Sequence, residues 1–162
     1  MSIDDLQKEL AESFTSPTTD RTISLCKKYG FEALGLGGQR IAVAWGEDQV
    51  AKLAWRKEGL VNNEIEWRLY SQAPKALQKL LCPSDQLLPC GALLQKRCLP
   101  SADCDPKIIK ELISWGISDA AVNMGFRDGS LVCYDYCFLS PSRLREIISN
   151  EKDPPLSLDN LN

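Results

Sequence analysis

The sequence RIAVAWGEDQVAKLAW, residues 40–55, decides the fold class. It contains two segments rich in β-forming residues, 40–45 and 49–55, separated by a short polar sequence at 46–48. This pattern is typical of a β-hairpin. Lys52 stands in the middle of the second segment, where a half-buried ammonium group is costly unless it is paired. Lys52 is therefore a candidate functional residue, although a lysine at a sheet edge can also extend its charged end into water.

A cluster of glycines precedes this hairpin. Gly35, Gly37 and Gly38 lie directly before the first strand. Because glycine has no Cβ, the backbone N–H groups of such a segment are able to approach a phosphate closely. The same cluster is also typical of an ordinary turn, so by itself it does not identify a phosphate site.

The segment after the hairpin predicts a helix. Residues 62–71 are rich in helix-forming side chains and include two acidic residues, Glu64 and Glu66. Two residues correspond to a rotation of about 200° on a helix, so only one of the two can face Lys52. Glu66 is the candidate partner, and a solvent-exposed helix residue is its alternative interpretation.

The second half of the chain contains another predicted hairpin, with a polar side chain at each end. Its turn is Asp128-Gly129, a strong turn dipeptide. Asn123 precedes the first strand and Asp135 follows the second. Oxygen atoms of this kind are the ligands that magnesium requires. The alternative interpretation is that Asp135 follows the strand without binding a metal.

Taken in this order, these features resemble the protein-kinase-like fold in its small bacterial or phage versions, over residues 33–140. The resemblance implies an α+β fold with a small antiparallel N-lobe sheet, a crossing helix and a minimal, truncated second lobe. It also implies ATP and magnesium as cofactors. In this interpretation the nucleotide-binding residues are Gly35, Gly37, Gly38, Ala42, Val50, Lys52 and Glu66, and the magnesium ligands are Asn123 and Asp135.

In the family, the strand lysine pairs with the α- and β-phosphates and the helix glutamate holds it, roles that fall here on Lys52 and Glu66. Ala42 and Val50 take the places of the adenine-pocket roof, with their sizes exchanged relative to the family. Cores tolerate exchanges that conserve volume. We therefore expect both residues on the Lys52 side of the hairpin, facing one cavity.

The sequence departs from the family at several positions. Ser118 occupies the place of the catalytic aspartate, and Asp119 reaches that place only through a one-residue deletion. Cys137 replaces the glycine expected after the magnesium-binding segment, and Arg40 stands near the third glycine of the phosphate loop. Residues 138–162 are too few for an activation segment and substrate-binding helices. We therefore expect no measurable phosphorylation of generic protein substrates, with Asp119 as the candidate catalytic residue if the chain is active.

The chain divides into four expected segments. They are an N-terminal helical extension at 1–30, an N-lobe-like sheet and helix at 31–99, a truncated C-lobe-like segment at 100–150, and a flexible tail at 151–162.

Local signals predict further elements within these segments. Ser2 and Asp20 are the expected N-caps of two N-terminal helices. Short strands are expected at 80–82 and 92–95. Pro106 opens a helix at a position where its missing N–H has no cost.

The composition excludes several classes of function. The 162 residues contain no histidine, so a Ser-His-Asp or Cys-His catalytic unit and a histidine-ligated metal are impossible within the chain. Nineteen basic and 22 acidic residues give a net charge of −3, which does not favour binding to nucleic acid or to an anionic membrane. The N-terminal sequence contains no secretory signal pattern, so we expect a cytoplasmic protein.

Seven cysteines are present, at positions 26, 82, 90, 98, 104, 133 and 137. No CxxC pair occurs among them, so we expect neither zinc nor haem. In a reducing compartment the default is free thiols, and we expect no intramolecular disulfide in reduced protein. Buried cysteines pack as small apolar side chains.

The favoured function is a kinase-like pseudokinase or nucleotide-binding remnant that acts through contacts with a protein partner. One alternative is a small active kinase dependent on ATP and magnesium. Another is a phage or mobile-element interaction protein, such as an inhibitor, with a vestigial pocket. Magnesium-dependent nucleotide binding separates the first two from the third, and turnover separates the second from the first.

Overall fold

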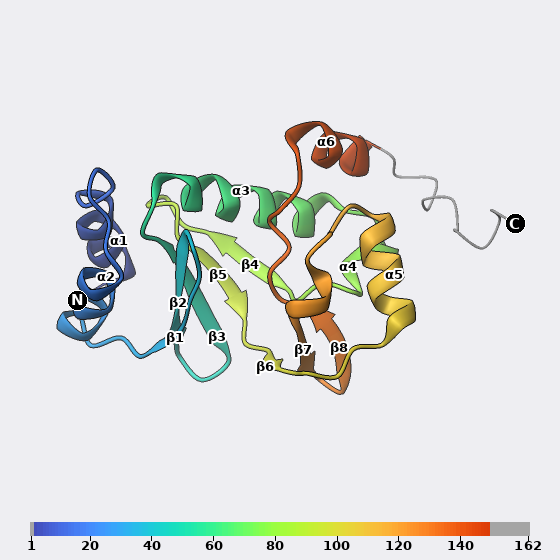
Figure 1. The fold of residues 1–162 in the computed structure, drawn as a ribbon, viewed down its shortest axis with the longest axis horizontal. Helices are drawn as coiled ribbons and strands as arrows, with labels where there is room; N and C mark the ends of the chain where they lie inside the picture. Colours follow the sequence, from blue (N-terminus) through green and yellow to red (C-terminus); the bar gives the residue numbers. More distant parts are fainter. Residues whose placement is uncertain (1, 150–162) are drawn as a thin grey trace, which may run out of the picture. The chain divides into compact units, whose positions relative to one another are not determined.

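The computed structural model describes residues 2–149, so the tail predicted for 151–162 lies outside the described residues. The chain forms two compact units (Figure 1). Among the described residues, unit 1 comprises 2–67 and 84–97, and unit 2 comprises 68–83 and 98–149. The predicted α+β class is confirmed, since six α-helices accompany a five-stranded antiparallel sheet and a three-stranded sheet within residues 2–149. No helix in that range is long and apolar enough to cross a membrane.

Two helices begin unit 1, α1 (Ile3–Ala11) and α2 (Thr19–Lys28). Ser2 is the N-cap of α1, as predicted, and forms a reciprocal capping box with Asp5. The predicted cap of α2 is wrong by two residues. The hydroxyl of Thr18, not Asp20, accepts the hydrogen bond from the Arg21 amide, and Asp20 lies in the first turn.

The unit 1 sheet has the strand order β1-β2-β3-β5-β4. Its strands are β1 (Ala33–Leu36), β2 (Arg40–Trp45), β3 (Gln49–Ala54), β4 (Ser84–Leu87) and β5 (Leu93–Lys96). The hairpin predicted at 40–55 is present as β2 and β3. The strand predicted at 80–82 is wrong, because Leu81 forms only an isolated bridge and the strand begins at Ser84.

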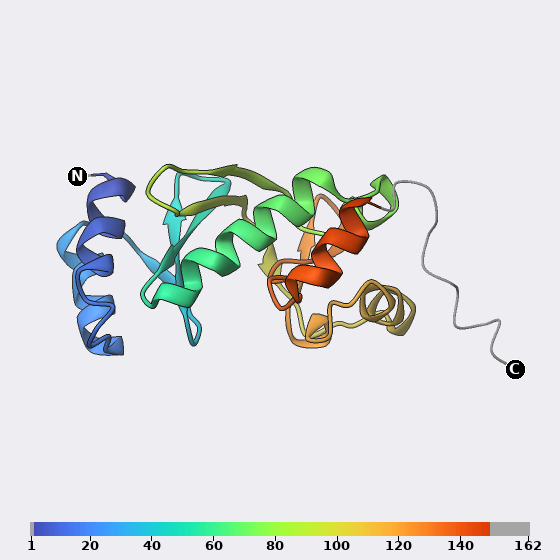
Figure 2. The same cartoon turned by 90° about the horizontal axis from the view of Figure 1, so that it is seen from above.

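The two faces of β2 and β3 differ in their packing. Ile41, Val43, Ala51 and Leu53 are fully buried in one apolar cluster with α1 and α2. Strand alternation places Lys52 on the opposite face. Figures 1 and 2 show α1 and α2 on one side of these strands and the first half of α3 (Lys57–Gln72) on the other. The N-terminal helices therefore cover one face of the sheet and leave the Lys52 face to α3.

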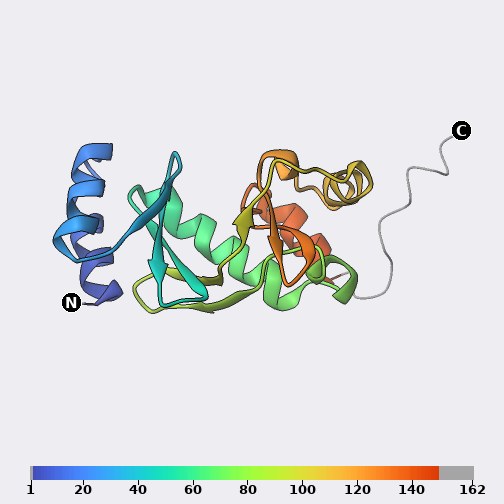
Figure 3. The same ribbon diagram turned by 90° about the horizontal axis from the view of Figure 1, so that it is seen from below.

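Unit 2 contains a three-stranded sheet in the order β6-β7-β8 (Figure 3). Its strands are β6 (Leu99–Pro100), β7 (Met124–Arg127) and β8 (Ser130–Cys133), and its helical elements are α4 (Lys75–Gln78), α5 (Pro106–Ser114), the 3-10 helix η1 (Ala120–Val122) and α6 (Pro141–Ser149). The predicted Asp128-Gly129 turn is present, and both of its residues have positive φ, as a tight hairpin turn requires. Pro106 opens α5, as predicted.

Candidate functional site

A buried ion-pair cluster in unit 1 centres on Glu66, whose carboxylate is inaccessible to solvent. Its Oε1 accepts hydrogen bonds from Lys52 Nζ and, at 2.8 Å, from Gln95 Nε2. Its Oε2 accepts from Arg40 Nη1 at 2.7 Å. These donors come from β3, β5 and β2, which are neighbouring strands. One carboxylate therefore attaches α3 to three adjacent strands.

Asn63 lies one turn before Glu66 and extends the same network. Its side-chain Oδ1 accepts from Arg40 Nη1 at 3.1 Å. Its Nδ2 donates to the backbone carbonyls of Lys52 and Gly91, each at 2.8 Å. Both the oxygen and the nitrogen of the Asn63 side-chain amide are therefore hydrogen-bonded in the protein interior. The bond to the Lys52 carbonyl attaches α3 to β3.

Burial makes the pairing in this cluster obligatory. Lys52 is 6% exposed and Arg40 is 7% exposed. An ionised side chain withdrawn from water is stable only when it is paired and hydrogen-bonded. The predicted Lys52–Glu66 ion pair is present, and Glu64, the competing residue, is exposed.

Sequence reasoning missed Arg40, Asn63 and Gln95 as members of this cluster. Two signals were available. Asn63 and Glu66 are spaced i, i+3 and so lie on one helix face. Gln95 directly follows an apolar segment, Ala92–Leu94, which is a position typical of a buried strand. Neither signal identifies the partner, because each partner lies on another element.

Gly37 and Gly38 lie in the turn of the β1–β2 hairpin, and Gly35 lies in β1, opposite Ala42. Gly37 donates its amide to the Arg40 carbonyl at 2.9 Å, and its own carbonyl accepts from the Trp55 indole at 3.0 Å. Gly35 and Gly38 do not have positive φ, and a Cβ on either would meet no heavy atom within 4 Å. Neither backbone conformation nor packing within the protein therefore requires glycine at positions 35 and 38.

The two predicted roof residues lie on the face of the sheet that carries Lys52. Ala42 is directly opposite Lys52 in the β2–β3 register, and Val50 is opposite Ala44. Both Ala42 and Val50 are partly exposed, unlike the fully buried residues of the other face. The predicted parity is confirmed, and the adenine cavity stays a prediction.

Unit 2 holds the residues predicted for catalysis and metal binding. Asn123 Nδ2 donates to Asp119 twice, to the backbone carbonyl at 3.2 Å and to Oδ2 at 2.9 Å. The Asn123 carbonyl accepts from the Tyr134 amide at 2.8 Å, so Asn123 and Asp135 lie at the same open end of the β7–β8 hairpin. The Cys137 thiol donates to Asp135 Oδ1 at 3.3 Å. These oxygen atoms are of the type that binds magnesium.

The cysteines differ in their bonding and in the pKa of their thiols. The expectation of free thiols is wrong for Cys82 and Cys98, which form a disulfide in unit 2. The other five cysteines are not disulfide-bonded. Burial raises the pKa of Cys26 and of Cys90 to about 11, so both are protonated at neutral pH.

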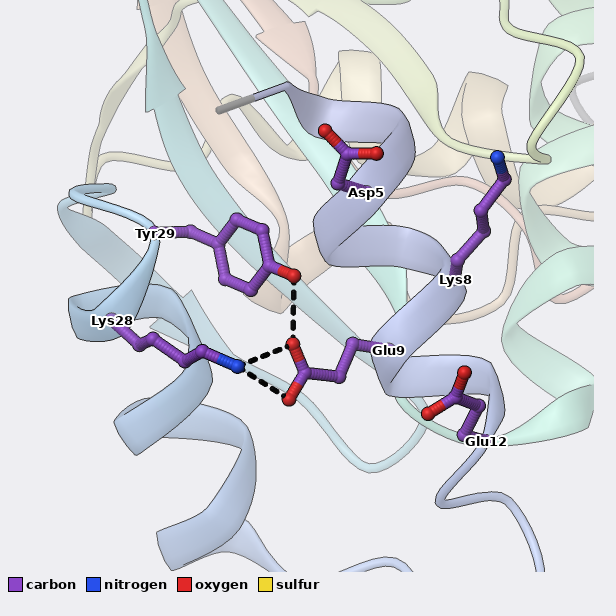
Figure 4. A pocket seen from close by; sticks show the side chains of 6 residues that line it. All are labelled: Asp5, Lys8, Glu9, Glu12, Lys28 and Tyr29. Atoms are coloured by element: carbon purple, nitrogen blue, oxygen red, sulfur yellow. Dashed lines mark hydrogen bonds and ion pairs between the residues drawn. The ribbon is translucent and has the colours of Figure 1, made fainter.

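A surface hollow between α1 and the end of α2 is lined by charged side chains and a tyrosine (Figure 4). Glu9 accepts two hydrogen bonds from Lys28 Nζ at 2.8 Å and one from the Tyr29 hydroxyl at 2.7 Å. The Lys28 and Tyr29 hydrogen bonds lower the pKa of Glu9, and the bond to Glu9 raises that of Tyr29 to about 12. These contacts join the two helices, and the hollow contains none of the predicted site residues.

Comparison of the chain with protein-family models, curated proteins and solved structures finds no match.

Proposed function

We propose that this protein is a kinase-like pseudokinase, which binds the phosphates of ATP through unit 1 and acts through contacts with a protein partner. The buried Lys52–Glu66 ion pair carries the proposal. A lysine on the third strand, held by a glutamate of the following helix, is the arrangement with which kinase-like proteins bind nucleotide phosphates. Arg40 adds a second cation at the same carboxylate, and clustered cations suit a polyphosphate.

The glycines of the β1–β2 hairpin support the same function. Since neither backbone conformation nor packing explains glycine at positions 35 and 38, a ligand that approaches the backbone supplies a reason for them. Backbone N–H groups at such a turn are donors for phosphate oxygens. For unit 2, the corresponding proposal is that Asn123 and Asp135 bind magnesium.

Two observations favour a pseudokinase over an active kinase. Ser118, at the family position of the catalytic base, has no carboxylate. Asp119 Oδ2 is engaged by the Asn123 amide. Positioning of the attacking group is a large part of phosphoryl-transfer catalysis, so a displaced base predicts little turnover.

Exposed apolar side chains in unit 2 favour a protein partner. Leu99 is 68% exposed, Val122 is 76% exposed and Phe138 is 57% exposed. Each of these three side chains is a candidate contact with a partner, because an interface would remove its apolar surface from water. The same exposed residues also suit the alternative function, an interaction protein with a vestigial pocket, but that function predicts no nucleotide binding.

Thermal unfolding with ATP, with and without magnesium, tests the proposal. At 100 times its Kd a ligand stabilises the folded state by about 2.7 kcal/mol, which raises the Tm of a chain of this size by roughly 5–11 °C. Lys52→Met should abolish the rise. Lys96→Met is the matched control, because Lys96 is a partly exposed lysine of the same sheet and should leave the rise intact.

The possible results separate the three functions. A rise in Tm without ADP production supports the pseudokinase. Robust turnover that Asp135→Asn abolishes would establish the active kinase instead. If ATP leaves the Tm of the wild-type chain unchanged with and without magnesium, the nucleotide site is wrong and the interaction protein is favoured.

A further inference from the structure

The Cys82–Cys98 disulfide joins the two points at which the chain leaves unit 2 and returns to it. The chain leaves unit 2 after Pro83, forms part of unit 1 as Ser84–Arg97, and returns to unit 2 at Cys98. The two cysteines therefore stand at the exit and at the return point, sixteen positions apart. Their bond closes a loop around the whole excursion.

The closed loop contains the hairpin of β4 and β5, which forms one edge of the unit 1 sheet. Gln95, a hydrogen-bond donor to the buried Glu66 carboxylate, lies near the end of this loop, three residues before Cys98. The disulfide therefore restrains the chain three residues after Gln95, a member of the buried cluster, without belonging to that cluster.

We propose that Cys82 and Cys98 are a reversible redox pair, whose oxidation closes the β4–β5 excursion and whose reduction releases it. This inference is independent of nucleotide binding and does not rest on the proposed function. It predicts that the local stability of Ser84–Lys96 follows the redox state of this pair.

The two cysteines differ in exposure, so an external disulfide such as glutathione disulfide would react first with the more exposed one. Cys82 is fully buried, whereas Cys98 is partly exposed. The Cys98 thiolate attacks one sulfur of glutathione disulfide, which forms a mixed disulfide and releases one glutathione thiolate. The Cys82 thiolate then attacks the Cys98 sulfur and releases the second glutathione. The protein loses two protons and two electrons, and glutathione disulfide becomes two molecules of glutathione after protonation.

The remaining cysteines supply internal controls. Cys90 lies inside the closed loop and is not disulfide-bonded. Cys104 follows the return point in the sequence, is exposed and is likewise not disulfide-bonded. Cys90→Ser and Cys104→Ser should therefore leave the redox response unchanged.

The test equilibrates the full chain with mixtures of reduced and oxidised glutathione, alkylates free thiols and maps disulfides by peptide mass spectrometry. We expect Cys82–Cys98 to be oxidised and then reopened by dithiothreitol. Closing a loop of this length should raise the Tm by roughly 6–12 °C. Amide hydrogen exchange of Ser84–Lys96, measured without nucleotide, should be faster in the reduced chain.

The double variant Cys82→Ser with Cys98→Ser should lose all redox dependence of exchange and of Tm. A disulfide that maps to other cysteines would overturn the proposal. Equal exchange of Ser84–Lys96 in oxidised and reduced wild-type protein would also overturn it, and this comparison needs no variant. A pair that dithiothreitol cannot reopen in the folded chain would be a permanent crosslink and no switch.

Discussion

Because Lys52 and Arg40 share the Glu66 carboxylate, we expect their contributions to the free energy of unfolding to depend on each other. Replacing either cation by methionine keeps much of the side-chain volume and leaves Glu66 with the other cation and with Gln95. Each single variant should lose about 1.5–3 kcal/mol of unfolding free energy, the range for a hydrogen bond to a charged group. The two losses should not add.

The double variant leaves a buried carboxylate with only the neutral donor Gln95 among its three present partners. An uncompensated buried charge is costly, about 3–5 kcal/mol when a buried pair is broken. The first substitution is partly compensated by the remaining cation, and the second is not. The loss in the double variant should therefore exceed the sum of the single losses by about 1–3 kcal/mol.

Urea denaturation measures these losses, with the m-value as a check that the unfolded state is unchanged. Adding Glu66→Gln to the double variant is the control, because a neutral amide avoids the cost of the buried ion and should restore part of the stability. If the double variant does not fold, the triple variant should still fold. Additive losses within about 0.5 kcal/mol, or no recovery in the triple variant, would refute the shared-carboxylate argument.

Three further predictions concern other parts of unit 1. Gly38→Ala should leave urea stability unchanged but weaken ATP binding, whereas Gly59→Ala should lose about 1–3 kcal/mol because its Cβ would overlap Ala54 Cβ and a backbone carbonyl oxygen. Val50→Trp should fold normally and abolish the rise in Tm with ATP, and a large loss of stability would show a filled core there instead. Tyr29 has a raised pKa, so its bond to Glu9 stabilises the fold fully below pH 10.0 and loses this effect as the pH approaches 12. Urea titrations of wild type and Tyr29→Phe should therefore differ at pH 8 and converge towards pH 12, and a constant difference would contradict the linkage.

Elements with strong local signals could be predicted from the sequence. The β2–β3 hairpin has a polar turn between two β-forming segments, and the Asp128-Gly129 turn needs positive φ at both residues. The short strands β1 and β4 could not be predicted in this way. The four residues of β1 are Ala-Leu-Gly-Leu, with no polar side chain among them, so no alternation of apolar and polar residues marks the strand.

The buried cluster could be predicted only in part. The positions of Lys52 and Glu66 in the sequence resemble those of the lysine and glutamate of the kinase-like family, and this resemblance predicted their ion pair. Arg40 and Gln95 lie 26 and 29 positions from Glu66 in the sequence, and their polar character is equally compatible with an exposed strand end. Their convergence depends on strand order and register, which arise from the tertiary fold.

The same cluster has a consequence for the register of the sheet. A slip of one residue in β3 would move Lys52 to the face covered by α1 and α2, among fully buried apolar side chains. A slip in β5 would move Gln95 in the same way and remove its hydrogen bond to Glu66. Because either slip leaves a buried polar group without its partner, the network selects one register in both strands. The contacts that hold Lys52, the proposed phosphate ligand, therefore also stabilise the sheet on which it lies, so a variant that loses nucleotide binding must be checked for folding before its function is interpreted.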